Sequence, residues 1–519
     1  MDTDLQTRLE ELEAAAQSQE HSIRSQHERL AGLEARVKES GSRRLQTVSN
    51  SIHGGFDADH VAYSDDMSVK IMISHVWHFV CGALVFFMQA GFAMVEVGTC
   101  RSRSMDIIAM KYFTHVCIAA VCWWLCGWAF AYGGPLKTDS ASGKLIKKDF
   151  IGHEQFVGMD FYEDLGGGRF EPMMQIMPWF QQWAICVVAT SIVSGGVGER
   201  MTYLGYLVYS VVMAALVYPI VVCSTWGHGW LSNIMDAGFY DQAGSGVVHV
   251  CGGTAALIGA VVTGARGEGR VAAQRSDPSN TGLVLLGTFI LWFGWYGLNC
   301  GSVSMLSLAQ AFKAAQVAAN TTVSAALAGL TAFSFNFATT YRYDIGVFCS
   351  GIAAGLVAIS AGVATVPMWG ACALGIVAGA DYLAFSTLLK RLKVDDPCDR
   401  FAVHAIPGIA GIVLAPILDM SFDFASINAS GGWDCIRDST GNCATDAWIQ
   451  VFLSNLILAC AIFAWTVLWS VAVFFPLKIL GLTRAPTDVN EASPKAGADN
   501  REFSFSPTAN NSKPTLHAI

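Results

Sequence analysis

Apolar runs of about 20 residues, each followed by a short polar break, repeat along the chain from about residue 70 to 476. An α-helix of that length spans roughly 30 Å, which is the thickness of the hydrocarbon core of a bilayer. The pattern therefore predicts an all-α membrane protein with eleven transmembrane helices. The predicted spans are 70–96, 105–132, 173–197, 203–225, 244–265, 281–301, 309–338, 345–363, 367–390, 401–419 and 448–475.

The first 46 residues follow a different pattern, in which apolar side chains recur at heptad spacing within a polar sequence. Leu9, Ile23 and Leu30 fall at one core position of the heptad, which is typical of a coiled coil. Gln19 and Gln26 fall at the other core position and weaken the prediction. We therefore expect an N-terminal coiled-coil helix over residues 1–46, with a single amphipathic helix as the alternative.

Basic residues gather in the breaks that follow odd-numbered spans, and short cytoplasmic loops of membrane proteins carry an excess of Lys and Arg. This asymmetry predicts that the N-terminus lies outside the membrane and the C-terminus in the cytoplasm. The host is expected to be the plasma membrane. The basic residues are Arg101, Arg103, Arg200, Arg266, Arg270, Arg275, Arg342, Lys390, Arg391, Lys393, Arg400 and Arg484. The expected domains are an extracytoplasmic helix (1–46), a linker (47–69), a transmembrane domain (70–480) and a disordered cytoplasmic tail (481–519).

Composition agrees with a helical membrane bundle, because 53% of the residues are hydrophobic, only 14% are charged and 51 are glycine. Small residues let helices approach closely in lipid, where hydrophobic burial no longer drives their association. Most of the 15 cysteines stand singly in apolar runs, but Cys435 and Cys443 flank the polar segment CIRDSTGNC. We predict a disulfide there if the loop is extracytoplasmic. The sequence does not decide whether Asn428 in the same region is glycosylated.

Two histidines occupy equivalent places in a hidden repeat of the sequence. Span 5 contains His249 in VHVCGG, span 10 contains His404 in VHAIPG, and Asp241 and Asp396 each stand eight residues before the histidine. Ten of the spans then form two halves of five, and because five is odd the halves are inserted in opposite orientations. An inverted repeat of this kind predicts that the two histidines face each other near the membrane midplane.

An ionisable side chain within a span is a candidate for function by default. Neutral imidazole offers one donor and one acceptor nitrogen, and its pKa near about 6.5 lets it accept and return a proton. The alternative is a pair of core histidines bonded to backbone carbonyls. We expect no metal or other cofactor, because no cluster of Cys, Asp or Glu sits with the histidines at ligand spacing within the same spans. An enzyme is not expected either, since no nucleophile and base set or phosphate loop is present in the polar segments.

The motifs GFAMVEVG, SGGVGERM, YPIVVCSTWGHGWL, DQAGSGVVHVCGG, GTFILWFGWYGLNCGS and KRLKVDDPCDRFAVHAIPGIAG follow one another over residues 70–480. Their order resembles that of the ammonium transporter, methylammonium permease and Rhesus glycoprotein family, especially its ammonium transporter branch. The resemblance implies a homotrimer with one pore in each subunit, lined by the twin histidines. It also implies that Trp226 and Ser302 form an outer cation site, that Tyr218 and Trp295 line the pore, and that Asp241 organises the vestibule.

The chain departs from the family pattern at the gate below the outer site, where two aromatic residues are usual. Alignment on Glu199 puts Gln181 and Ile185 at the gate positions of span 3, and Leu298 stands where the family usually has Phe. Gln182 retains the family's glutamine. We expect Ile185 and Leu298 to form an apolar plug that lacks aromatic rings. The rate or the selectivity of transport is therefore expected to differ from that of the family.

The sequence as a whole predicts a transporter that recruits ammonium or methylammonium outside and removes its proton. Ammonia then passes the histidine pair. The alternative is an ammonium sensor of the same fold, which the altered gate and the added heptads motivate. The expected partners are the substrate cation, membrane lipid and two further copies of the chain, and no nucleic acid.

Overall fold

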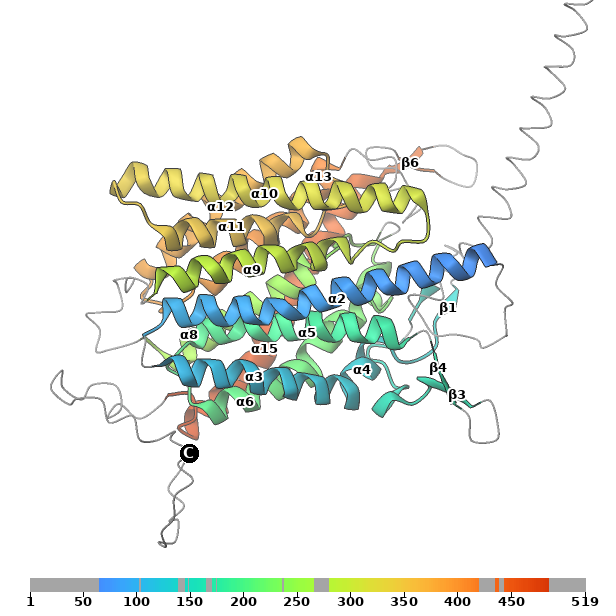
Figure 1. The fold of residues 1–519 in the computed structure, drawn as a ribbon, viewed down its shortest axis with the longest axis horizontal. Helices are drawn as coiled ribbons and strands as arrows, with labels where there is room; N and C mark the ends of the chain where they lie inside the picture. The colour runs from blue at the N-terminus through green and yellow to red at the C-terminus, as the bar shows by residue number, and fades with distance from the viewer. Residues whose placement is uncertain are drawn as a thin grey trace, which may run out of the picture. The chain divides into compact units, whose positions relative to one another are not determined.

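Long apolar helices make up most of the chain in the computed structural model (Figure 1). The structure describes residues 65–101, 104–138, 145–147, 149–164, 170–173, 175–235, 238–265, 280–419, 435–437 and 443–484. Its uninterrupted long helices are α2 (Asp65–Thr99), α5 (Ile176–Val197), α9 (Thr281–Cys300), α10 (Leu308–Thr340), α11 (Ile345–Ile359), α12 (Met368–Arg391) and α15 (Ala447–Ile479).

The other long helices contain a π-helical turn, in which one extra residue is accommodated in the helix. Such turns are often found at functional sites, and two of them carry the histidines singled out above. The composite helices are α3 (Met105–Cys122), η2 (Trp123–Gly127) and α4 (Trp128–Tyr132); α6 (Tyr203–Val212), η4 (Met213–Val217) and α7 (Tyr218–Ser224); η6 (Ser245–Val250) and α8 (Cys251–Thr263); and η7 (Phe401–Ala405) and α13 (Ile406–Leu418).

In the part of the chain that the structure describes, three two-stranded antiparallel ribbons and two 3₁₀ turns connect the helices. In the loop after α4, the N–H of Lys147 donates to the carbonyl of His228 at 2.8 Å, and its Nζ donates to Gly133 at 2.8 Å. Burial lowers the pKa of Lys147. The loop is thereby attached to the segment that carries Trp226. The elements are β1 (Lys137–Thr138), β2 (Leu145–Ile146), η3 (Phe156–Gly158), β3 (Tyr162–Asp164), β4 (Phe170–Pro172), η5 (Trp230–Asn233), β5 (Cys435–Arg437) and β6 (Cys443–Asp446).

Within the described residues, ten helices are long and apolar enough to cross a membrane. They correspond to ten of the eleven predicted spans. The eighth prediction, 345–363, falls on α11, an apolar helix of 15 residues that is shorter than a bilayer requires. An integral multi-pass membrane protein is therefore established, while the count of eleven remains a prediction.

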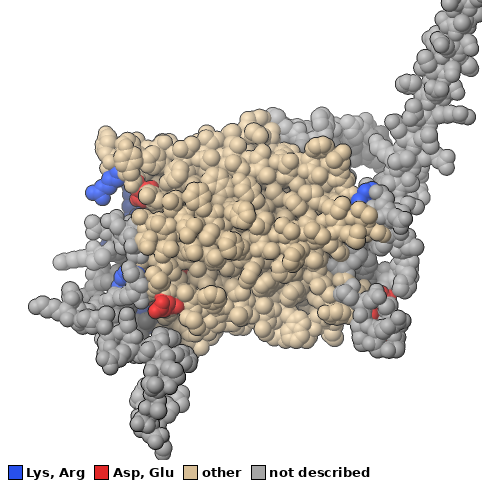
Figure 2. All heavy atoms as spheres, viewed as in Figure 1, with Lys and Arg blue, Asp and Glu red and all other residues tan. Residues whose placement is uncertain are grey.

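Charged side chains are distributed as a bilayer requires. In the face shown in Figure 2, the visible Lys, Arg, Asp and Glu lie toward the two ends of the helical body, with uncharged residues between them. Many large apolar side chains on the long helices are exposed, for example Phe113 (74%) on α3 and Phe289 (59%) on α9. Such side chains would be unfavourable in water and are suited to contact with lipid.

Facing glycines allow α2 and α9 to pack closely along their length (Figure 1). A Cβ at Gly91 would lie 2.9 Å from the carbonyl oxygen of Gly287, and a Cβ at Gly287 would lie 2.7 Å from that of Gly91. Both distances are too short for a side chain. Close approach of two backbones is thus one structural reason for the glycine content of this chain.

Several sequence-based predictions fall outside the described residues. These include the coiled-coil helix (1–46), Asn428 and the tail beyond Arg484. Helix α2 begins at Asp65, within the last residues of the predicted linker (47–69), and the domain boundaries stay a prediction. In the ribbon of β5 and β6, Arg437 pairs with Cys443 and Cys435 with Asp446. The side chains of both cysteines lie outside the described set, so the disulfide stays a prediction.

Candidate functional site

The structure brings His249 and His404 into direct contact at the centre of the helical body. Their Nδ1 atoms are 3.3 Å apart, and their ring centroids lie 5.3 Å apart with the planes inclined by 25°. Both side chains are buried, at 0% and 1% exposure. The Nδ1 to Nδ1 hydrogen bond requires that one ring donates and the other accepts. Neither Nε2 atom has a hydrogen-bond partner among the described residues, so both remain available to a polar guest.

The two histidines stand on elements with matching local structure. His249 lies in η6 and His404 in η7, and each π-helical turn packs against the α-helix that continues the other one. The residue five positions before each histidine has a left-handed backbone, with φ of 97° at Gly244 and 52° at Asp399. The repeat seen in the sequence therefore extends to backbone conformation.

Aspartates cap both π-helical turns. Asp241 Oδ1 accepts from the N–H of Gly244 at 3.1 Å, and its Oδ2 accepts from Gly246 at 2.8 Å and Val247 at 2.9 Å. Asp396 Oδ2 likewise accepts from the N–H five residues later, at 2.8 Å. Carboxylates are favourable at this end of a helix because the N–H groups there have no intrahelical partner. Burial raises the pKa of each carboxyl to about 6, against the opposing effect of the backbone donors.

The proposed outer site is assembled through the residues that precede η6. Trp226 Nε1 donates to the carbonyl of Asp241 at 2.9 Å, and the next side chain, Gln242, donates through Nε2 to the carbonyl of Ser302 at 2.6 Å. Ser302 Oγ donates to the carbonyl of Asn299 at 2.7 Å. Trp226 and Ser302 are thus both attached to residues 241–242. Gln242 was not singled out by the sequence, although its position beside Asp241 could have suggested it.

Several of the predicted gate and pore positions lie together in the hydrophobic core. Ile185 and Leu298 are buried, at 4% and 1% exposure, in one hydrophobic cluster that also includes Trp295. Trp295 stacks on His249 with ring centroids 5.1 Å apart, and its Nε1 donates to Ser360 Oγ at 3.3 Å. Ser360 is a further residue that sequence reasoning missed, because nothing near it in the chain marks it.

The remaining predicted positions lie in the same core but differ in their contacts. Gln181 donates through Nε2 to the carbonyl of Gly301 at 2.9 Å and so joins α5 to the end of α9. Gln182 Oε1 has no partner within the described residues. Tyr218 is fully buried, its hydroxyl has no described partner, and its ring lies 6.2 Å from that of Trp123.

The fold and this site define an integral membrane protein in which two similar helical segments enclose a buried imidazole pair. A family model described as "Ammonium Transporter Family" matches residues 76–503. The chain belongs to this family.

Curated relatives agree with this assignment. The chain is 33% identical over 427 residues to "Putative ammonium transporter 1" of Caenorhabditis elegans, covering 79% of this chain and 75% of the relative. It is 32% identical over 432 residues to "Ammonium transporter Amt2" of Archaeoglobus fulgidus, covering 81% and 86%.

Solved structures show the same fold. A structure titled "Sensor Amt Protein" matches with a TM-score of 0.68 and 27% identity, covering 82% of this chain and 99% of that chain. Mep2 of Saccharomyces cerevisiae matches with a TM-score of 0.65 over 80% of this chain and 88% of its own. At 24% identity, the second match supports the fold alone.

Proposed function

We propose that the chain transports ammonium and methylammonium through a pore that passes the histidine pair. The observation that carries this proposal is the buried contact between His249 and His404, whose Nε2 atoms have no partner among the described residues. A buried polar atom without a partner is unfavourable unless a guest satisfies it. Curated relatives named as ammonium transporters support ammonium as that guest.

Recruitment begins at Trp226 and Ser302. An indole face attracts a cation by about 0.5–2 kcal/mol depending on desolvation, and the serine oxygens accept hydrogen bonds from ammonium. Gln182 and Tyr218 supply further polar atoms in the adjoining core. Because potassium is also a cation, this site alone does not select ammonium against it.

Selection follows from what ammonium can do and potassium cannot. Ile185 and Leu298 form an apolar constriction with no atom that could replace the hydration shell of an ion. Ammonium can give up its proton to Nε2 of one histidine of the pair and continue as neutral ammonia, whereas potassium must keep its charge. A proton then shifts along the Nδ1 to Nδ1 hydrogen bond, the Nε2 of the other histidine releases its own proton toward the cytoplasmic side, and ammonia is reprotonated there.

A sensor of the same fold is the second candidate. It is favoured by the match to a structure titled "Sensor Amt Protein" and by the heptads at residues 1–46, which suit a protein partner better than they suit transport. A sensor would bind ammonium at the same outer residues and conduct it weakly or not at all.

A current recording separates the two candidates. The chain is reconstituted in planar membranes or proteoliposomes and challenged with ammonium, methylammonium and potassium. A transporter gives saturable ammonium and methylammonium responses with potassium excluded, and uptake is restored in a transport-deficient cell. Correctly folded protein that binds ammonium yet gives no flux would overturn the transport proposal in favour of the sensor.

We further propose a homotrimer in the plasma membrane, with the N-terminus outside, the C-terminus in the cytoplasm and residues 1–46 forming a coiled coil. The family resemblance and the distribution of basic residues support this assembly. Chemical cross-linking of the detergent-solubilised chain is expected to yield a trimer, and removal of residues 1–46 is expected to weaken it. A monomer from the full chain would contradict the assembly.

A further inference from the structure

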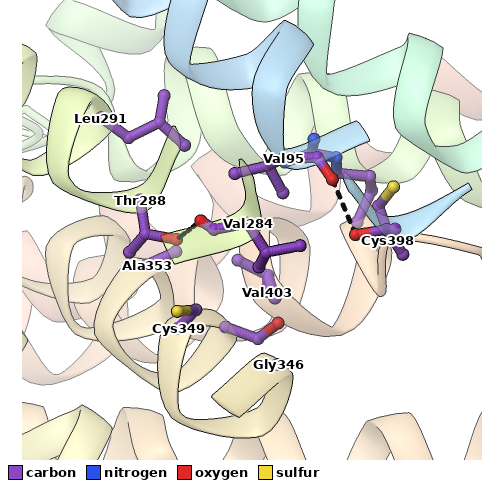
Figure 3. A pocket seen from close by; sticks show the side chains of 12 residues that line it. Val95, Val284, Thr288, Leu291, Gly346, Cys349, Ala353, Cys398 and Val403 are labelled. Carbon is purple, nitrogen blue, oxygen red and sulfur yellow. Dashed lines mark hydrogen bonds between the residues drawn. The ribbon is translucent and has the colours of Figure 1, made fainter. Parts of the chain in front are cut away.

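A cavity of about 30 Å³ lies between α2, α9, α11 and the start of η7 (Figure 3). Its wall includes Thr99 at the end of α2, Val284 near the start of α9 and Gly346 at the start of α11. The basic residues of the adjoining breaks assign these helix ends to the cytoplasmic side. Val403, the neighbour of His404, also lines this inner cavity. Its volume suits one small molecule such as water or ammonia.

Arg400 also lines the inner cavity, although only 3% of the side chain is exposed. Its Nε and Nη2 have no hydrogen-bond partner among the described residues. The guanidinium carbon lies 5.1 Å from the ring centroid of Phe92, and that ring lies 6.1 Å from the ring of His404. The side chain crosses α5 at Gly195, where any Cβ would collide with Nε. A single ring therefore separates the guanidinium from the histidine pair.

An arginine in this position is chemically unusual. Its guanidinium stays protonated at any physiological pH, so burial cannot neutralise it. A buried charge destabilises a fold unless hydrogen bonds and opposite charges offset it, so a buried arginine at the end of a span, with Nε and Nη2 unpaired among the described residues, is a functional candidate.

Comparison of the two halves shows that local folding does not require this charge. Arg400 stands four residues before His404, and the residue four positions before His249 is Ser245. Ser245 Oγ donates to the carbonyl of Val357 at 2.7 Å and carries no charge. The position four residues before the histidine is therefore neutral in one half, at the first residue of η6, and a permanent cation in the other, at the residue just before η7.

Only part of the charge of Arg400 is balanced nearby. Glu96 is fully buried and accepts from the hydroxyls of Tyr112 at 2.8 Å and Ser194 at 3.1 Å. Lys111 is also fully buried and donates to two backbone carbonyls. Asp396, four residues before Arg400, is a second buried carboxyl group that interacts electrostatically with the guanidinium, but no described ion pair joins Arg400 to either carboxylate.

We propose that Arg400 is a charge-selectivity residue of the pore, which repels cations at its inner end and lets neutral ammonia leave. The proposal rests on the proposed transport function and deepens it. Glu96 acts in the opposite direction, because its carboxylate reduces the local positive potential. A unit charge acting over about 10 Å through an effective dielectric of about 20 lowers the entry of a monovalent cation by roughly tenfold.

The test compares variants of the full chain in proteoliposomes, with the ratio of potassium current to ammonium current as the readout. Arg400→Gln is expected to raise this ratio by about tenfold, and Glu96→Gln is expected to lower it. Arg391→Gln is the matched control, since Arg391 is an exposed arginine at the same cytoplasmic end, on α12. Water and salt screen its charge, so the ratio is expected to stay at the wild-type value.

Two further variants keep the proposal testable if Arg400→Gln fails to fold. Arg400→Met removes the charge but keeps the length of the side chain, and Gly195→Ala displaces the guanidinium without removing it. Either variant is expected to raise the ratio. Ammonium conduction with a wild-type ratio in the Arg400 variants would overturn the assignment of Arg400. A wild-type chain that folds and carries no ammonium would instead refute the transport function, and the two failures are thereby distinguished.

Discussion

His249→Leu combined with His404→Leu is expected to reduce ammonium flux by about a hundredfold or more, because a positioned proton-transfer group contributes on the order of 10²–10⁴ to a rate. Leucine matches the buried volume well enough to preserve packing, but it can neither hydrogen-bond nor carry a proton. The measurement is ammonium-dependent current in proteoliposomes, with membrane insertion and thermal unfolding of the variant checked in parallel.

A double substitution elsewhere serves as the control for this experiment. His75 and His78 lie in the N-terminal part of α2 and are partly exposed. His75→Leu combined with His78→Leu removes the same number of imidazoles and is expected to leave the flux close to wild type. Undiminished ammonium current in the variant that lacks His249 and His404 would show that the pair does not transfer protons during transport.

Asp241→Ala is expected to destabilise the protein by about 3 kcal/mol or more, because hydrogen bonds to a charged acceptor contribute about 1.5–3 kcal/mol each and are not fully additive. Three backbone N–H groups, of Gly244, Gly246 and Val247, would lose their buried acceptor together. The midpoint of thermal unfolding in detergent measures the effect. Loss of η6 would also displace His249, so flux is expected to fall with stability.

Two variants calibrate that result. Asp241→Asn keeps one acceptor oxygen, so this variant is expected to lose less stability than Asp241→Ala. Asn280→Ala removes a single exposed cap, the bond from Leu283 N–H at 3.0 Å, and is expected to lose only about 1 kcal/mol. A loss for Asp241→Ala no larger than that for Asn280→Ala would mean that the carboxylate does not hold η6 in place.

The sequence predicts the helices well because a bilayer imposes one requirement on every crossing, a long apolar run. It also predicts which two segments meet, since His249 and His404 share their flanking residues and their spacing to an aspartate. It does not predict where polar side chains point. Gln181 was assigned to a gate, but its amide binds the carbonyl of Gly301 in the neighbouring helix.

Arg400 illustrates the same limit. In the sequence it is one of several basic residues that mark the cytoplasmic side, whereas in the structure its side chain turns inward and is 3% exposed. Hydrophobic periodicity locates a residue along a helix but does not say whether a long side chain turns toward water or inward across a facing glycine such as Gly195. The contact between Arg400 and Gly195 joins two segments that are distant in the sequence, so it is seen only in the folded structure.

The π-helical geometry of η6 has a consequence for how this chain tolerates length changes. A π turn contains one residue more than an α-helical turn, so deleting a single residue within 245–250 would let the segment relax into a regular α-helix. Because the extra residue is accommodated within the π turn, the side chains of α8 beyond it would keep their direction, whereas those inside the turn, His249 among them, would change theirs. His249 would leave the central contact even though no chemically important group had been removed, so insertions and deletions here are more damaging than most substitutions.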